Sequence, residues 1–256
     1  MTTKYSYSRV SCYKNCPRQF QYRYLLKYDT IPEQNADNAL YLGLGLHKGI
    51  ETTVEEGVAE YLSHYYCISD ANINWAMQLE YQIPKVKEIL PKGIHEVEVV
   101  TDGFVGYLDL LVPTFKDGDV QHYDLYDFKF SNNVERYLES PQLSIYKDRF
   151  EASKPFSVID HLYFVFVPKL MIRQKKTETV QTFRARLTEE LEKTTVRIEE
   201  VEFNQNKVDT YFTDIAEIEN ANEYPPNPTR LCDWCGYRGL CFNNDYTDII
   251  ERNEEG

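Results

Sequence analysis

FVGYLDLLVPTFKDGDVQHYDLYDFKF, residues 104–130, is the stretch that decides the fold. It reads as two apolar strands, and each carries one acid where an aliphatic residue is expected, Asp109 in the first and Asp127 in the second. Side chains alternate along a strand, so Asp127 and Lys129 share one face while Phe128 points to the other. Charges on a largely buried strand are costly unless they are paired or bind a metal. The stretch therefore indicates a functional site.

The segments around this stretch predict helices and strands in an α/β order. The residue before Pro17 avoids helical backbone, so a first helical region breaks at the Cys16-Pro17 step, after an N-cap at Ser8. Pro113 is expected to end the first central strand. Helices are expected at residues 8–27, 39–66, 70–92, 133–151, 178–193 and 207–221, and strands at residues 94–102, 104–113, 122–130, 157–167 and 196–203, with a turn at 116–119. This order predicts a central mixed β-sheet flanked by helices.

Length and composition fit one domain. The chain has 256 residues, of which 42% are hydrophobic and 14% aromatic, enough for a sizeable core. We expect a single domain over residues 1–256, with a helical part at 29–93, a catalytic sheet at 94–203 and a cysteine-rich segment at 222–242.

The compartment follows from what the sequence lacks. No apolar run reaches the roughly 18 residues of a membrane span, and MTTKYSYSRV has no apolar signal-peptide core. We therefore expect a cytoplasmic, reducing setting and no membrane partner. Six cysteines in that setting are metal ligands or core residues more often than disulfides.

The net charge of −13 argues against a protein that binds nucleic acid through an overall positive charge. Residues 1–28 nevertheless contain no acid, and the segment 169–186 is locally basic. Such clusters are often simply solvated, and the tyrosines among them suit helix packing as well as base stacking. The strongly acidic last third offers a surface for a protein partner. The basic residues expected to contact DNA are Arg9, Lys14, Arg18, Arg23, Lys175 and Lys176.

A histidine stands among glycines in the helix that begins at Ala39. Gly43 and Gly45 precede His47, and each glycine costs a helix roughly 1 kcal/mol relative to alanine. That cost is tolerated where a backbone must approach another backbone or a ligand closely. Taken alone, His47 fits an ordinary half-buried helix histidine.

Two carboxylates on adjacent strands repel each other unless a cation lies between them. Mg²⁺ or Mn²⁺ suits them, with Asp109, Asp127 and the backbone carbonyl of Phe128 as oxygen ligands. His47 would complete the shell and favour Mn²⁺. Lys129 would then orient an attacking water and offset charge on a phosphoryl group, which is metal-assisted phosphodiester hydrolysis. A lone Asp-x-Lys is also common as a surface ion pair.

The ordered set His47, Gly106-Tyr107-Leu108-Asp109, Asp127-Phe128-Lys129 and Gln142-Leu143-Ser144-Ile145-Tyr146 resembles the PD-(D/E)XK nuclease superfamily. Its RecB-type and CRISPR-associated exonuclease branches are the most similar, including an N-terminal helix with a Cys-Pro step. The resemblance implies a restriction-endonuclease-like core, His47, Asp109 and Asp127 as metal ligands, and Lys129 as the catalytic lysine. It also makes Gln142 and Tyr146 active-site or DNA-positioning groups. Many relatives have Glu where this chain has Asp127.

The C-terminal cysteines have the spacing C-x2-C-x5-C, at Cys232, Cys235 and Cys241. A tetrahedral metal or a four-iron cluster needs a fourth ligand, for which Cys16 is the candidate and Cys12 the reserve. Spacing alone favours zinc, whereas the resemblance implies a [4Fe–4S] cluster that joins the N- and C-terminal segments.

These features lead to one main functional hypothesis. We expect a metal-dependent DNA nuclease, an exonuclease on single-stranded DNA or DNA ends, with the exonuclease preference implied by the resemblance alone. Two alternatives stay open: a nuclease-like DNA-binding or recombination-complex subunit with a metal staple and little activity, and a zinc-stapled endonuclease.

Overall fold

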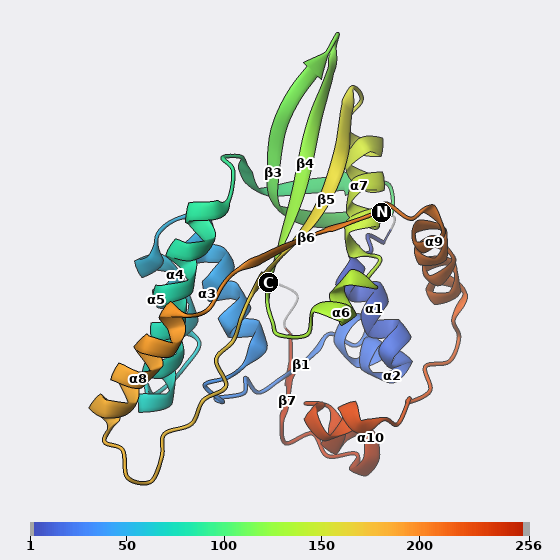
Figure 1. Cartoon of the computed structure of the whole chain (residues 1–256). Coiled ribbons are helices and arrows are strands. Elements are labelled where there is room, and N and C mark those ends of the chain that lie inside the picture. The colour runs from blue at the N-terminus through green and yellow to red at the C-terminus, as the bar shows by residue number, and fades with distance from the viewer. Residues whose placement is uncertain (1–2, 253–256) are drawn as a thin grey trace. The chain divides into compact units, whose positions relative to one another are not determined.

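The computed structural model describes residues 3–252, which divide into two compact units (Figure 1). The sheet unit comprises Gln34–Val99 and Tyr107–Phe203. The terminal unit comprises the described residues up to Glu33, Val100–Gly106 and the described residues from Asn204 on. The single domain expected from the sequence stays a prediction.

The sheet has five strands in the order β2-β3-β4-β5-β6. β4 pairs parallel with β5, whereas the pairs β3–β4 and β5–β6 are antiparallel. The sheet is therefore mixed, and the predicted α/β class is confirmed. The strands are β2 (Ile94–Thr101), β3 (Phe104–Asp117), β4 (Val120–Phe130), β5 (Ser157–Val167) and β6 (Arg197–Val201).

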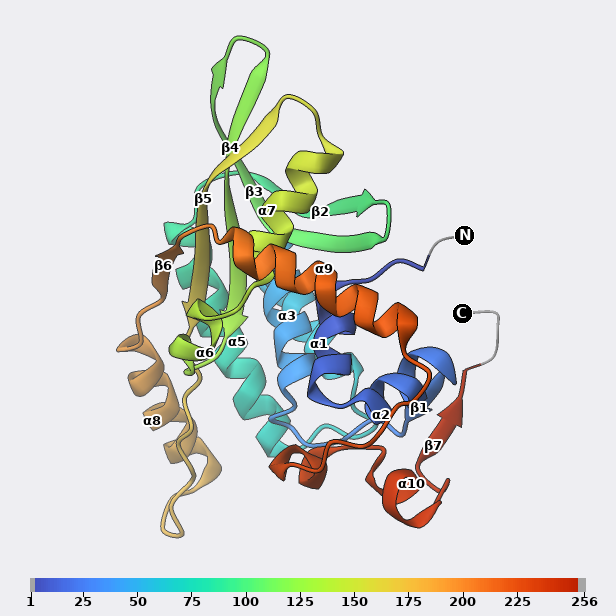
Figure 2. The ribbon, with the colours of Figure 1, turned by 90° about the vertical axis from the view of Figure 1, so that its right-hand side faces the viewer.

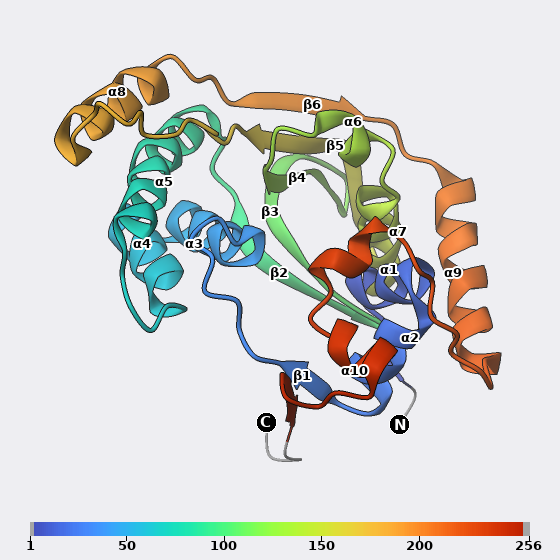
Figure 3. The same ribbon diagram turned by 90° about the horizontal axis from the view of Figure 1, so that it is seen from below.

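Helices cover both faces of the sheet. α3 (Ala39–Glu51), α4 (Val54–Ser63) and α5 (Asp70–Ile89) lie on one side, and α7 (Gln142–Ser153) lies on the other (Figure 3). In the main core, α3, α4 and α5 pack against alternate strand residues, including Tyr126, Phe128 and Phe130 of β4. The intervening Asp127 and Lys129 consequently face the α7 side, as the alternation of the strand predicts.

The central hairpin is longer than expected. β3 does not end at Pro113 but continues to Asp117, with a register shift between Pro113 and Lys116 that absorbs the proline. Proline lacks an N–H and is tolerated at such an irregularity. The turn uses Gly118 at φ +57°, a left-handed conformation that glycine adopts without strain.

The helix expected at residues 39–66 is two helices, because the Thr53 side chain accepts the Glu56 N–H and starts a new one. Glycines let the backbones of α3 and α4 meet. A Cβ on Gly57 would lie 2.5 Å from the Gly45 carbonyl and 2.6 Å from the Cα of Gly49. Gly45 thus serves the expected close approach, but Gly43 has nothing within 4 Å of a Cβ.

Other boundaries shift slightly. The helix expected at 133–151 is split into α6 (Val134–Leu138) and α7, and α8 (Val180–Glu192) is shorter than expected. α5 has 20 residues and includes Pro84. Within the described part of the chain, none of the helices combines the length and apolarity needed to cross a bilayer.

The terminal unit is built from short elements of both ends of the chain (Figure 2). The Cys16-Pro17 break is confirmed, but the N-cap of α1 is Ser6 rather than Ser8. β1 pairs antiparallel with β7, and Tyr22, Tyr237 and Leu240 form a small core. Its elements are α1 (Tyr7–Asn15), α2 (Pro17–Phe20), the π-helix η1 (Gln21–Leu25), β1 (Tyr28–Thr30), α9 (Gln205–Asn220), the 3₁₀-helix η2 (Arg230–Trp234), α10 (Arg238–Asn243) and β7 (Ile249–Glu251).

Candidate active site

The candidate site lies where the pairing of β3 with β4 stops. The last pair is Leu110 with Tyr126, so the register places Asp109 opposite Asp127. The Phe128 N–H donates to Asp109 Oδ2 at 2.7 Å, so a side chain replaces the missing main-chain partner. The strands separate here without leaving that buried N–H unsatisfied.

Helix α3 brings His47 to both strands. Its Nε2 lies 3.1 Å from the Phe128 carbonyl oxygen, and its Nδ1 lies 3.4 Å from Asp109 Oδ1. The carbonyl expected to bind a metal therefore contacts the imidazole directly. The close packing of α3 on α4 at Gly45 and Gly49 fixes the helix that carries this histidine.

Glu96 of β2 is the acid that the sequence analysis missed. Its Oε1 lies 4.0 Å from His47 Nδ1, and the ligand atoms of His47, Glu96 and Asp109 all lie within 4.8 Å of one another. One imidazole and two carboxylates are suitable ligands for Mn²⁺ or Mg²⁺. The residues present therefore fit a divalent cation, although Asp127 does not belong to this closest group.

Asp127 instead anchors a polar network with Lys129 and α7. Lys129 Nζ lies 2.5 Å from Asp127 Oδ2 and donates to Gln142 Oε1 at 3.1 Å. The Gln142 amide donates to Asp127 Oδ1 at 2.9 Å and contacts the Tyr146 hydroxyl at 3.2 Å. Asp127 is only 1% exposed, so this network holds a buried charge pair in one geometry.

The charges shift one another's pKa values. Burial disfavours the imidazolium of His47, but the Asp109 and Asp127 carboxylates together outweigh burial and raise the pKa of His47 to about 9. Burial raises the pKa of Asp127 against the opposing effect of Lys129, and the nearby Asp109 charge adds to the rise. Burial lowers the pKa of Lys129, but Asp127 and Asp109 together raise it overall. A cluster in which burial and neighbouring charges change pKa values in opposing directions is typical of a functional site.

A family comparison agrees with this geometry. A family model described as the PD-(D/E)XK nuclease superfamily matches residues 4–242, most of the chain. The chain belongs to the PD-(D/E)XK nuclease superfamily. A metal-dependent, phosphodiester-cleaving nuclease is therefore the activity that the family implies. The chain has no match among the curated proteins compared.

One solved structure, "Crystal structure of SSO0001", is similar at 13% identity over 80% of this chain and 84% of that chain. Its TM-score of 0.34 is too low to bear on fold or function.

The fold brings the expected site residues together. His47, Asp109, Phe128 and the network of Asp127, Lys129, Gln142 and Tyr146 are connected by the contacts given above, and their catalytic roles stay predictions. Glu96 could have been suspected from its alternation in the strand after residue 93. Its left-handed backbone, at φ +50°, was not readable from the sequence.

The residues expected to contact DNA differ in their availability. Lys175 and Lys176 are exposed on the segment before α8. Lys14, by contrast, pairs with Asp214 at 2.6 Å and with Glu217 at 3.4 Å. The three arginines expected to contact DNA lie over aromatic rings of the terminal unit: Arg9 over Tyr5, Phe20 and Tyr24, Arg18 over Tyr22, and Arg23 over Tyr24. The tyrosines between these cations therefore serve at least partly as packing.

The structure does not support the expected [4Fe–4S] cluster or its zinc alternative. Cys16, Cys232, Cys235 and Cys241 line one small pocket of the terminal unit. Among residues 3–252, the cysteines are not placed to bind a cluster, and none of them belongs to a group of side chains that could hold a metal. The sulfur of Cys16 lies 3.5 Å from the Asn227 N–H, and that of Cys232 lies 3.4 Å from the Thr229 N–H. The remaining cysteines, Cys12 and Cys67, are also free thiols.

Proposed function

We propose that this protein hydrolyses DNA phosphodiester bonds with Mn²⁺ or Mg²⁺. It is an exonuclease of the RecB-type branch and acts on single-stranded DNA or on DNA ends. The observation that carries the proposal is the ligand group of His47, Glu96 and Asp109 beside the buried pair of Lys129 and Asp127. Ion-pair networks that serve structure alone do not need a histidine and two further acids at the same point.

The residues divide the chemistry between them. His47, Glu96 and Asp109 would hold the cation, which supplies an activated water and neutralises phosphate charge. Asp127 and Gln142 hold the Lys129 ammonium in place, so that it can orient the attacking water and stabilise charge on the phosphoryl oxygens. Tyr146 fixes the Gln142 amide from the next helical turn.

The preference for single strands and ends draws on the distribution of positive charge. The sheet unit carries Arg173, Lys175 and Lys176 on an exposed segment, where they can contact the phosphates of a single strand. The order of His47, Asp109, Asp127-x-Lys129 and Gln142-x3-Tyr146 supports assignment to the exonuclease branch.

Cleavage assays test the proposal. End-labelled linear and circular single strands and linear duplex are incubated with Mn²⁺, Mg²⁺ or a chelator, with Lys129→Ala as the inactive variant. Lys116→Ala, at an exposed position near the hairpin turn, removes the same charge as a control. We expect metal-dependent degradation of linear single strands by the parent and by the control. Cleavage of circles would identify an endonuclease, and no cleavage with either metal would favour a DNA-binding subunit.

A further inference from the structure

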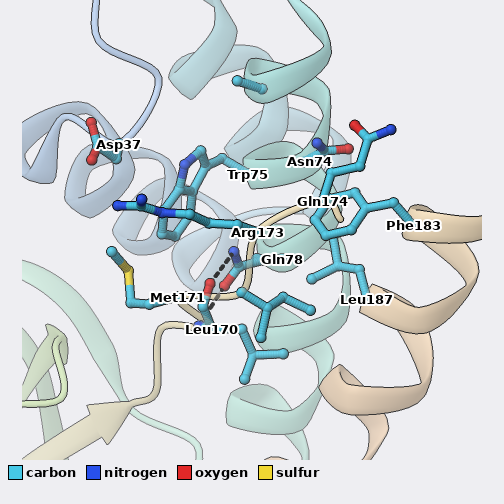
Figure 4. A pocket seen from close by; sticks show the side chains of 12 residues that line it. Asp37, Asn74, Trp75, Gln78, Leu170, Met171, Arg173, Gln174, Phe183 and Leu187 are labelled. Carbon is cyan, nitrogen blue, oxygen red and sulfur yellow. Dashed lines mark hydrogen bonds between the residues drawn. The ribbon is translucent and has the colours of Figure 1, made fainter. Parts of the chain in front are cut away.

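A cavity of about 280 Å³ lies in the sheet unit, between α5, α8 and the segment that follows β5 (Figure 4). None of the candidate active-site residues lines it. One water occupies about 30 Å³ in the liquid, so the cavity has room for a small planar organic group.

The wall of this cavity is built by specific hydrogen bonds. Gln78 Nε2 donates to the Leu170 carbonyl at 3.1 Å, and the Leu170 N–H donates to Gln78 Oε1 at 2.8 Å (Figure 4). These two bonds hold the segment after β5 against α5. The half-buried indole of Trp75 adds a large aromatic surface to the lining.

Polar groups at the cavity remain available. Asn74 Oδ1 accepts from Arg184 Nε at 3.0 Å, which fixes the amide and leaves its N–H groups to donate. The Asp37 carboxylate and the Arg173 guanidinium also line the cavity, and both residues are exposed. Within residues 3–252, no ion pair is recorded for either of them. The cavity thus combines an aromatic surface with hydrogen-bond donors, an acceptor and a cation.

Positive charges lie on the segment that lines the cavity opposite the Asp37 carboxylate. Arg184 and Arg186 are neutralised by Asp70 and Glu178, at 2.8 Å and 2.7 Å. In the part of the chain that the structure describes, no ion pair is recorded for the exposed Arg173, Lys175 and Lys176. Arg173 and Lys176 can therefore contact phosphate groups, and so can Lys175, whose charge also lowers the pKa of Glu178.

The cavity also adjoins the strand that carries the candidate catalytic pair. The Trp75 ring meets the Phe130 ring edge-on at 6.5 Å, and Lys169 Nζ lies 5.0 Å from that same ring. Phe130 follows Asp127 by three positions, about 10 Å along a strand. Phe130 points to the α5 face of β4 and Asp127 to the α7 face, so a DNA strand at the candidate active site would pass the end of β4 to reach the cavity.

We propose that this cavity, the base pocket, binds one unpaired nucleobase of the DNA strand being processed. The base stacks on Trp75, Asp37 and Asn74 hydrogen-bond its edge, and Arg173, Lys175 and Lys176 contact the adjoining phosphates. Every base has a flat face, so an aromatic platform binds a single strand without regard to sequence. The inference rests on DNA being the substrate, and it explains a single-strand preference because a paired base is not free to enter.

The test measures DNA binding in the absence of divalent metal, so that the DNA is not cleaved. The affinity for a fluorescent oligothymidylate is measured in chelator by anisotropy for the parent, Trp75→Ala, Trp75→Phe and Arg173→Ala. Arg197→Ala is the matched control, since it removes one arginine from an exposed position on β6. The chain has 2 tryptophans, so Trp234→Phe leaves Trp75 as the one tryptophan, whose emission is read with selective excitation that avoids the tyrosines.

We expect Trp75→Ala to weaken binding about tenfold and Trp75→Phe to retain most of it. Arg173→Ala should weaken binding and reduce its salt dependence. The affinity of Arg197→Ala should stay within about twofold of that of the parent. Oligothymidylate should quench Trp75 fluorescence in the Trp234→Phe protein. Thermal melts of all variants separate lost binding from lost folding, and the exposed Arg173 provides the test should Trp75→Ala fail to fold.

Two results would overturn the base pocket: a parent that does not bind oligothymidylate, or parent-like affinity of folded Arg173→Ala and Trp75 variants with unchanged Trp75 fluorescence. If the protein binds and quenches as expected but cuts no DNA with either metal, the nuclease proposal fails and the base pocket stands. If it cuts DNA without these binding effects, only the base pocket fails.

Discussion

The Nζ of Lys129 lies 2.5 Å from the Oδ2 of Asp127, in a pair that is almost fully enclosed. Removing one partner of a buried ion pair leaves the other charge without compensation, at a cost of about 3–5 kcal/mol. The candidate catalytic group is thus also a structural group, which shapes the first prediction.

Lys129→Ala should abolish most cleavage, by at least about 10²-fold, and lower the free energy of unfolding by a few kcal/mol. Lys129→Ala combined with Asp127→Asn should regain much of the stability, because no uncompensated charge remains, but not the cleavage. Urea unfolding and cleavage rates of both proteins check this. A double variant as unstable as the single one would contradict the charge-pair interpretation.

Glu96→Gln should weaken Mn²⁺ binding about ten- to hundred-fold, because it removes a carboxylate from the ligand group. Glu98→Gln is the matched control on the same strand, where Glu98 accepts the Tyr107 hydroxyl at 3.0 Å outside that group. Calorimetric titration of both variants with Mn²⁺ measures the difference. Equal affinities would exclude Glu96 as a ligand.

Mn²⁺ affinity should rise with pH. The pKa of His47 is about 9 in place of 6.5, so the metal-free protein holds an imidazolium at pH 7, whereas a ligating imidazole must be neutral. We expect about one proton released per Mn²⁺ bound at pH 7.5, and affinity that rises up to tenfold per pH unit until about pH 9. Because the folded-state pKa is raised, the His47 contribution to metal-free stability is full below about pH 6.5 and is lost as pH rises through 9.

Titrations in two buffers of different ionisation enthalpy measure the protons released. His122→Gln, which alters a histidine paired with Asp160 elsewhere in the sheet unit, is the control and should release the same number. Binding without proton release would contradict the raised pKa of His47.

Gly57→Ala should destabilise the protein by about 1–3 kcal/mol, since its Cβ would meet backbone atoms of α3 at 2.5–2.8 Å. Gly43→Ala is the control in α3, with nothing within 4 Å of the new methyl group, and should stabilise by about 0.4–1 kcal/mol. Thermal or urea unfolding distinguishes them. Equal effects would show that close packing of the helices does not depend on Gly57.

Much of the site could be predicted because it follows from local alternation. Side chains alternate along residues 124–130, which places Asp127 and Lys129 on one face of the strand. The structure has both side chains on that face. Gln142 and Tyr146 are likewise spaced by about one helical turn, so they lie together on one face of the helix. These are relationships within single elements, so the sequence contains them.

The rest depends on contacts between distant segments. Lys14 pairs with Asp214, 200 positions away, so its availability to DNA could not be judged from its neighbours. Glu96 has a left-handed backbone in β2, which local propensity argues against, and its approach to His47 and Asp109 depends on the pairing of distant segments. Cysteine spacing gave plausible ligands but contained nothing about the distances between their sulfurs.

Asp109 performs two tasks with two atoms: Oδ2 holds the Phe128 N–H, and Oδ1 faces His47. Under the proposed function, a substitution at Asp109 would disturb both the joining of the two strands and the candidate metal group. In a survey of variants, cellular abundance and enzymatic turnover should fall together at this position, whereas at Glu96 turnover should fall while abundance persists.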